Sequence, residues 1–254
     1  MRGMQRIAGL MLAAPLVAMA GDAPVAWVDL HASAWVDVDA LGKAHVIEME
    51  KVKGLADVVQ STPIAETIKE RLHDRIESWQ FNPATRDGVA VVSRTHLHVV
   101  MEGFDDGAGN LGVRIRSAAT GPDVKDWNDY GLARAGVTAG EEGIVTFYIA
   151  YGADGKVTAA EVRESKTFSG GRFVGTASKT LRKGLLAVAR RWTFVPEQVA
   201  GQPVPGSGVL PIRVCFSGAC ISATDASSGG KLESNFASTV PAVTLGSAVA
   251  GTAL

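Results

Sequence analysis

The sequence has few of the features that would assign it to a familiar catalytic or nucleic-acid-binding class. Its 25 basic residues are balanced by 26 acidic ones, so it lacks the basic field that nucleic-acid binding usually needs. No serine lies in a G-x-S-x-G motif. The glycine-rich stretch SGGRF, which begins at Ser169, lacks the lysine of a phosphate-binding loop. These absences predict a non-enzymatic protein that has no cofactor and does not bind nucleic acid.

An apolar run long enough to cross a membrane is also missing. Residues 7–20 are uncharged and mostly apolar, follow Arg2 and Arg6, and end in the A-x-A sequence of Ala18 to Ala20. As a helix this run would span about 21 Å, which is short of a hydrocarbon core of about 30 Å. The pattern is typical of a secretory signal peptide, residues 1–20, cleaved after Ala20. The alternative is that the segment is retained as an inner-membrane anchor.

Cysteine and histidine are scarce. The two cysteines, Cys215 and Cys220, are close in sequence in a chain predicted to be exported, so we expect a disulfide between them. The alternative, half of a Cys-x4-Cys metal site, has no second cysteine pair to complete it. His96 and His98 would share one face of a strand, but no carboxylate is adjacent to them in sequence. We therefore expect exposed histidines and no metal site. The alternative is that the pair begins a metal site, which would allow an enzyme that uses these histidines.

One short motif occurs twice. Each copy has Trp, then Phe two residues later, Pro four residues later and Gly nine residues later. A shift of 113 positions superimposes the two copies without a gap, and it also places Gly42-Lys43 on Gly155-Lys156. We interpret this as two copies of one unit, in which the motif packs in the core and ends a helix. A ligand-stacking role for the aromatic rings is the alternative. The motif residues are Trp79, Phe81 and Pro83 in the first copy and Trp192, Phe194 and Pro196 in the second.

Both copies have the same predicted order of elements. In the second copy, strands are expected from Ile144 and from Val157, joined by the hairpin dipeptide Asp154-Gly155. Apolar residues at helical spacing predict a helix over 177–191, and a third strand begins at Val209. The first copy has expected strands at 34–38, 44–51 and 91–100, and an apolar helical stripe of Ile64, Ile68, Leu72, Ile76 and Trp79.

The pattern predicts an α+β protein of two tandem two-layer units. Each unit runs strand-strand-helix-strand, with one helix on a three-stranded antiparallel sheet. Part of the connection between the units is expected to be ordered, because long structureless connections are uncommon. The end of the chain is rich in Ala, Ser, Gly and Thr, and we expect it to be flexible. The predicted parts are a signal peptide (1–20), a first unit (21–104), a linker (105–126), a second unit (127–220) and a flexible tail (221–254).

Several motifs of the second unit follow one another in a fixed order. They are a Gly-x-Val before alternating apolar residues, an Asp-Gly turn, R-W-x-F-x-P at the helix exit, Gly-x-Pro-Val and a last strand ending in Phe. In this order they resemble the TonB carboxyl-terminal domain family. The first unit departs from the pattern, with Leu41 in place of the turn Asp and no Arg before Trp79. The matching residues are Gly143, Val145, Asp154, Gly155, Arg191, Trp192, Phe194, Pro196, Gly201, Pro203, Val204 and Phe216.

The resemblance implies a periplasmic protein of a Gram-negative envelope. Members of this family bind a short segment of an outer-membrane protein as an extra strand at a sheet edge, which satisfies unpaired backbone groups. The expected edge is the last strand, with Val209, Leu210, Ile212, Arg213 and Val214. Pro211 withholds one N–H inside this strand, as an edge strand allows. The alternative is that this proline only protects the edge from aggregation.

Two departures from the family bear on function. Energy transducers of this family keep an N-terminal membrane helix and a proline-rich spacer, whereas this chain has a short apolar segment and ten prolines that form no spacer. We therefore expect a non-enzymatic periplasmic binding or adaptor protein, whose oligomeric state the sequence leaves open. The alternative is an energy transducer with a retained anchor that drives outer-membrane receptor transport, and only this alternative implies contact with a membrane.

Cleavage after Ala20 is tested by fractionating cells and sequencing the N-terminus of the recovered protein. We expect a chain that begins at Gly21, in the soluble periplasmic fraction. An intact N-terminus in the membrane fraction would contradict this prediction and favour the anchored transducer.

Overall fold

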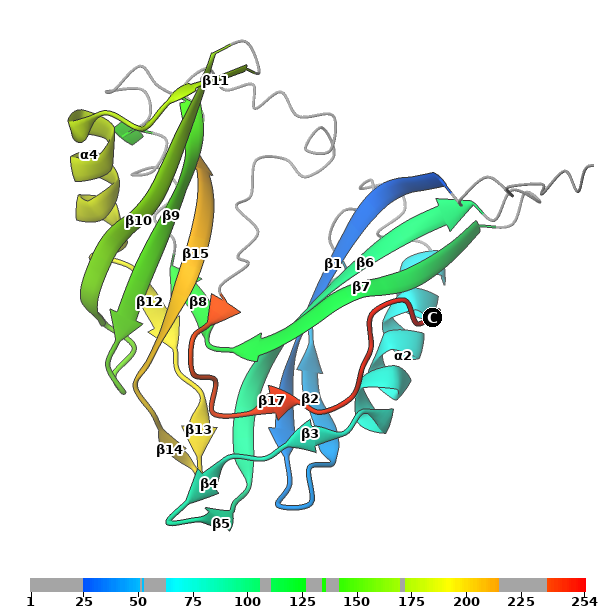
Figure 1. Cartoon of the computed structure of the whole chain (residues 1–254). Coiled ribbons are helices and arrows are strands. Elements are labelled where there is room, and N and C mark those ends of the chain that lie inside the picture. Colours follow the sequence, from blue (N-terminus) through cyan, green and yellow to red (C-terminus); the bar gives the residue numbers. More distant parts are fainter. Residues whose placement is uncertain are drawn as a thin grey trace, which may run out of the picture.

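The protein is an α+β chain made mostly of antiparallel strands, accompanied by two helices within its described residues (Figure 1). The computed structural model describes residues 25–50, 52, 63–105, 111–126, 134–135, 142–169, 172–214 and 237–254. The predicted signal peptide and both cysteines, Cys215 and Cys220, lie outside these residues.

The first sheet is built around the long strand β1 (Val25–Val38). It pairs with β2 (Ala44–Met49) on one side and with β6 (Ser93–Asp105) on the other. Helix α2 (Pro63–Ser78) packs against one face of this sheet and begins at a proline, which has no N–H to leave unpaired. The helix buries Ala65, Ile68, Leu72 and Ile76, whereas Ile64, expected in the apolar stripe, is exposed.

The second sheet has the same arrangement of its main strands. Strand β9 (Glu142–Tyr151) lies between β10 (Val157–Ser169) and β15 (Gly206–Val214). Helix α4 (Lys179–Ala189) starts after Ser178, whose hydroxyl accepts a hydrogen bond from the Leu181 amide at 3.1 Å. The helix buries Leu181, Leu185 and Ala189, and it begins and ends two residues inside the predicted range.

Short strands extend both sheets and connect them. The first sheet has the order β14-β13-β6-β1-β2, with β7 also paired to β6, and the second has the order β11-β10-β9-β15-β16. The remaining strands are β3 (Phe81–Asn82), β4 (Thr85–Arg86), β5 (Val89–Ala90), β7 (Leu111–Gly121), β8 (Asp123–Asp126), β11 (Arg172–Gly175), β12 (Thr193–Val195), β13 (Gln198–Val199), β14 (Gln202–Pro203), β16 (Ala237–Ser238) and β17 (Thr244–Leu245).

The same backbone hydrogen bond joins each helix exit to the hairpin of its sheet. The Phe81 amide donates to the Gly42 carbonyl at 2.9 Å, and the Phe194 amide donates to the Gly155 carbonyl at 2.8 Å. Both glycines have positive φ, +81° and +76°. A Cβ on either would lie 2.1 Å from the carbonyl oxygen of the facing phenylalanine. Glycine is therefore required at both turns for two reasons, backbone conformation and close approach.

The aromatic residues of the repeated motif lie in two separate hydrophobic cores. Trp79 and Phe81 belong to the first core, under α2. Trp192 and Phe194 belong to the second, where the Trp192 ring meets the edge of the Phe147 ring and Phe194 stacks on Tyr151. Burial of such large rings contributes strongly to the stability of each core.

Both sheets are larger than the predicted three strands. Residues 105–126, expected as a linker, instead contain β7, which pairs with β6 from His96 to Asp105, and β8. The partial order expected of this connection is thus observed, but its role as a linker is corrected. The reason is that the outer edge of β6 would otherwise leave its backbone groups unpaired.

The flexible tail expected over residues 221–254 is corrected for residues 237–254. This segment forms β16 and β17 and buries Val243 and Val249 in the first core. It then passes alongside β7 to α2, where Arg71 and Arg75 donate to its last two carbonyls (Figure 1). Its many small residues are typical of a disordered tail. The burial of Val243 and Val249 and the backbone hydrogen bonds of this segment nevertheless hold it on the first sheet.

The two halves exchange strands across the predicted boundary. Strand β8, which follows the first sheet, pairs with β12 at the exit of α4. Strand β17, near the end of the chain, pairs with β3 at the exit of α2. Strand β13 of the second half also pairs with β6 of the first. Each half therefore completes the surroundings of the other's helix exit.

The close contact at Gly155 predicts a large loss of stability in Gly155→Ala, because the new methyl group must displace the Phe194 carbonyl. Gly88→Ala is the matched control, since Gly88 has a similar φ of +79° but nothing within 4 Å of its Cβ position. Unfolding in urea should show a loss of about 1–2 kcal/mol for the control, from backbone strain alone. Gly155→Ala should lose clearly more, and equal losses in the two variants would contradict the prediction.

Candidate functional site

The predicted edge strand β15 is partly covered by the chain itself. It pairs with β9 along its whole length, from Gly206 to Val214. On its other side, called here the outer edge, β16 pairs with Gly208 and Val209. The expectation that Val209 lies at an open edge is therefore corrected. Among the described residues, no strand pairs with the outer edge from Leu210 to Val214.

The side chains of this strand divide between core and surface. Leu210, Ile212 and Val214 are buried in the second core, so they hold the strand in place and are not exposed to a partner. Pro211 is exposed. Arg213 is partly exposed and forms an ion pair with Glu142 at 3.4 Å. A partner at this edge would consequently meet the backbone of β15 and the side chains of Pro211 and Arg213.

The contact with the C-terminal segment shows which backbone groups point outward. The Thr239 amide donates to the Ser207 carbonyl at 2.9 Å, so Ser207 directs its backbone groups away from β9. In an antiparallel strand alternate residues point the same way, which places Val209, Pro211 and Arg213 on the outer edge. Proline at position 211 therefore withholds a hydrogen bond from the outer edge and none from β9. The outward carbonyl of Pro211 lies where no strand of the described residues pairs with this side of β15.

A buried carboxylate holds the segment that covers Val209. Glu197 accepts hydrogen bonds from the Thr95 hydroxyl at 2.7 Å and from the Ala242 amide at 2.9 Å. Its side chain is almost fully buried, and this burial raises the pKa of the Glu197 carboxyl. Burial, together with the nearby charge of Glu197, also raises the pKa of Tyr151. Glu197 thus joins β6 of the first sheet to the C-terminal segment.

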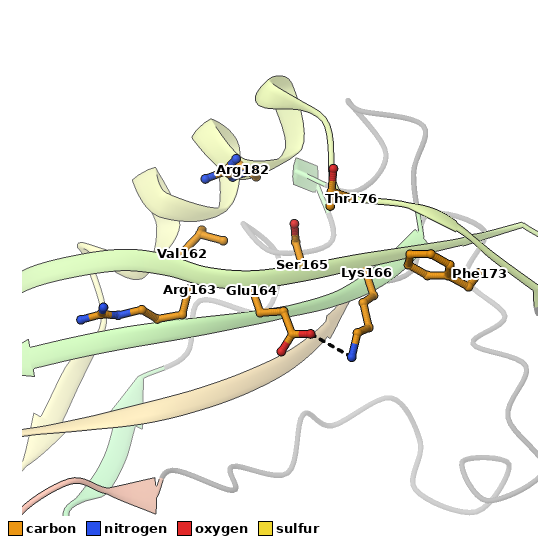
Figure 2. Close-up of a pocket in the computed structure, with 8 residues that line it drawn as sticks. All are labelled: Val162, Arg163, Glu164, Ser165, Lys166, Phe173, Thr176 and Arg182. Atoms are coloured by element: carbon orange, nitrogen blue, oxygen red, sulfur yellow. Dashed lines mark ion pairs between the residues drawn. The ribbon is translucent and has the colours of Figure 1, made fainter.

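A cavity of about 400 Å³ opens between β10, β11 and the start of α4 (Figure 2). Its charged groups are already paired in part, since Lys166 contacts Glu164 at 2.8 Å. The Ser165 hydroxyl accepts a hydrogen bond from the Ala177 amide, and the described residues that line the cavity include no histidine or cysteine beside it. These residues therefore form no pair of nucleophile and base.

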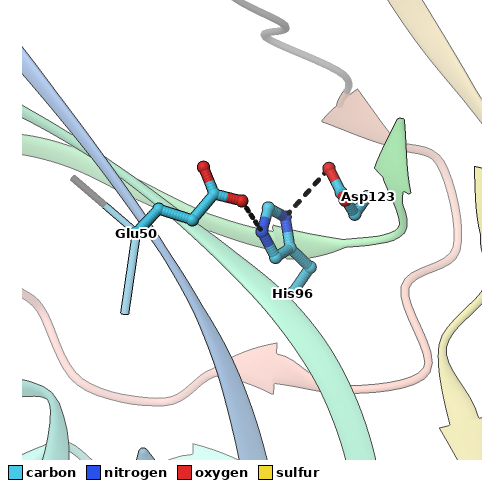
Figure 3. A group of neighbouring side chains, drawn as sticks. All are labelled: Glu50, His96 and Asp123. Carbon is cyan, nitrogen blue, oxygen red and sulfur yellow. Dashed lines mark ion pairs between the residues drawn. The ribbon is translucent and has the colours of Figure 1, made fainter. Parts of the chain in front are cut away.

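His96 is buried, which corrects the expectation of an exposed histidine. Its side chain is 1% exposed, and neither ring nitrogen has a hydrogen-bond partner among the described residues. A carboxylate oxygen of Glu50 lies 3.7 Å from Nε2, and one of Asp123 lies 3.9 Å from Nδ1 (Figure 3). His98 lies beside it with Nδ1 3.3 Å from the Ser33 hydroxyl. Sequence reasoning identified the histidine pair but missed both carboxylates, because they come from distant parts of the chain.

Comparison with known proteins adds no further assignment. No protein-family model, curated protein or solved structure matches the chain. The resemblance to the TonB carboxyl-terminal family stays a prediction from the motifs. Within the described part of the chain, neither helix has the length and apolar character needed to cross a membrane.

The buried carboxyl of Glu197 predicts a dependence of stability on pH. A raised pKa means that the folded chain keeps this proton in a pH range where the unfolded chain has lost it. The free energy of unfolding of the wild type therefore falls as pH rises above about 4.5, the ordinary value for glutamate. Glu197→Gln cannot ionise, so its stability relative to the wild type should increase over the same range. Glu197→Ala leaves its donors unpaired and should lose about 1–3 kcal/mol.

Chemical unfolding of the three proteins at several pH values measures these differences. Parallel pH profiles for the wild type and Glu197→Gln would contradict the role assigned to burial of the carboxyl.

Proposed function

We propose that the protein is a non-enzymatic binding or adaptor protein of the Gram-negative periplasm. It would hold an extended segment of an envelope or outer-membrane protein at the outer edge of β15, from Leu210 to Val214. The main support is that the third strands of the two sheets, β6 and β15, differ in how much of their outer edge is paired. Strand β6 is paired along its outer edge with β7, whereas β15 is paired at Gly208 and Val209 only, among the described residues.

We also infer that the two halves are copies of one strand-strand-helix-strand unit. In both, the third strand pairs with the first, and the first pairs with the second, giving the orders β6-β1-β2 and β15-β9-β10. The contact between helix exit and hairpin glycine recurs at a spacing of 113 positions. Two short hairpins recur at the same spacing, with positive φ at Asp87 and Gly88 and at Ala200 and Gly201.

The two units then have different roles. In the first unit, β7 pairs with the outer edge of β6, so this edge is already filled by the same chain. In the second unit, the corresponding place beside Pro211 and Arg213 is the one assigned to a partner. The first unit serves as a rigid support, because β13 and the C-terminal segment connect the two units.

An extended peptide matches the chemistry of this place. The outward carbonyl of Pro211 can accept a hydrogen bond from a peptide amide, and the exposed Pro211 ring can contact the side chains of the peptide. The signal-peptide pattern of residues 1–20 and the motifs shared with the TonB carboxyl-terminal family support a periplasmic location and an envelope partner.

The hydrogen-bond donor that Pro211 withholds from the outer edge predicts different effects of two substitutions. Pro211→Ala places an N–H on this edge, whereas Pro203→Ala lies in β14 of the first sheet and leaves the edge unchanged. A peptide selected from a displayed random library on the wild-type protein should bind Pro203→Ala with an affinity within about twofold of the wild type. Its affinity for Pro211→Ala should rise about threefold or more, as expected for one added backbone hydrogen bond.

Fluorescence anisotropy of the labelled peptide measures both affinities. Equal melting temperatures of the two variants provide the folding control. Equal binding to both variants, or a selection that yields no peptide, would contradict binding at this edge.

A further inference from the structure

The buried imidazole of His96 has carboxylates near both ring nitrogens but no hydrogen bond among the described residues. Strand alternation places His96 on the face of the sheet opposite Leu97 and Val99, which point into the first core. The ring of Trp35 packs against it, with ring centroids 4.9 Å apart, and its side chain is 1% exposed. Leaving both ring nitrogens of a buried histidine without hydrogen bonds costs free energy, so such an arrangement calls for a ligand.

Each carboxylate beside His96 is placed for an ion between itself and a ring nitrogen more than for a hydrogen bond. The separations of 3.7 Å to Glu50 and 3.9 Å to Asp123 exceed the length of an N–H···O hydrogen bond. Two ligand atoms on a tetrahedral zinc ion, each bonded at about 2.0–2.1 Å, lie about 3.3 Å apart. One potential ligand atom from each of the three residues lies within 4.8 Å of the other two. A small movement of one carboxylate toward the ring nitrogen that it faces therefore brings these two atoms to metal-binding distance.

We propose that His96 and one of its two facing carboxylates, Glu50 or Asp123, bind a divalent transition metal ion, with zinc as the best match. One ring nitrogen of His96 coordinates the ion together with the carboxylate that it faces. The other ring N–H donates to the remaining carboxylate, as metal-binding histidines commonly do. A mixed nitrogen and oxygen donor set suits zinc, whereas calcium and magnesium prefer oxygen ligands alone.

Glu50, His96 and Asp123 come from three different segments, so the site forms only in the folded chain. Glu50 directly follows β2, His96 lies in β6, and Asp123 begins β8. Because β8 pairs with β12 at the exit of α4, a bound ion would connect the first sheet to the second unit. A ligand bound only by the folded chain stabilises it, so this site would act as a structural clamp between the units. The inference does not depend on peptide binding at β15.

Isothermal titration of the untagged wild-type protein with zinc chloride tests the site. We expect one ion per chain, with a dissociation constant below about 10 µM, and no comparable binding of calcium. Glu50→Gln and Asp123→Asn should each weaken zinc binding by about tenfold or more. Both carboxylates are partly exposed, so these variants are expected to fold even if His96→Gln does not.

His73 provides the matched control. It lies on the surface of α2 beside Asp74 and Glu77, so it offers the same residue types without burial. His73→Gln should bind zinc like the wild type. At one zinc concentration, zinc should also raise the melting temperature of the wild type and of His73→Gln more than that of Glu50→Gln. The absence of one-to-one binding, or binding unchanged by both carboxylate substitutions, would overturn the proposal.

Discussion

The fold depends on one backbone contact that occurs twice, between a helix exit and a glycine turn. Trp79 and Trp192 complete the buried faces of the helices, and the next phenylalanine donates its amide to a glycine carbonyl in the hairpin. This bond fixes where the helix ends relative to the sheet, so it also sets the direction in which the chain leaves toward β6 or β15. Any side chain at the glycine would separate the two elements. The positions of both third strands therefore follow from this contact.

The exchange of strands makes the two halves mutually dependent. Strand β8 covers the exit of α4, and β17 covers the exit of α2, so neither helix exit is completed by its own half. Glu197 adds a buried carboxyl group at this junction, which accepts hydrogen bonds from Thr95 of β6 and from Ala242 of the C-terminal segment. A buried carboxylate is tolerated only where donors satisfy it. This junction therefore selects one relative placement of the C-terminal segment.

Local patterns predicted much of the fold, and long-range contacts explain the rest. The glycine turns, the buried faces of α2 and α4 and the main strands follow from spacing that a short window contains. The pairing of β7 with β6 and the packing of Val243 depend on surfaces formed by other parts of the chain, so composition alone suggested a linker and a flexible tail. The same limit applies to the site around His96. Its carboxylates, Glu50 and Asp123, approach the ring only after the first sheet and β8 are in place.

The proposed roles of the two units follow from whether the outer edge of the third strand, β6 or β15, is paired. An unpaired edge risks uncontrolled association, so a chain that keeps one must restrict what can pair with it. In β15 the buried side chains of Leu210, Ile212 and Val214 hold the strand against the core, while Pro211 removes one of the outward donors. A peptide can then pair with only a few backbone groups, beginning where β16 ends at Val209. The pairing of β16 with Gly208 and Val209 thus sets the register for a partner strand. Pro211 lowers the affinity of peptides that do not match this edge.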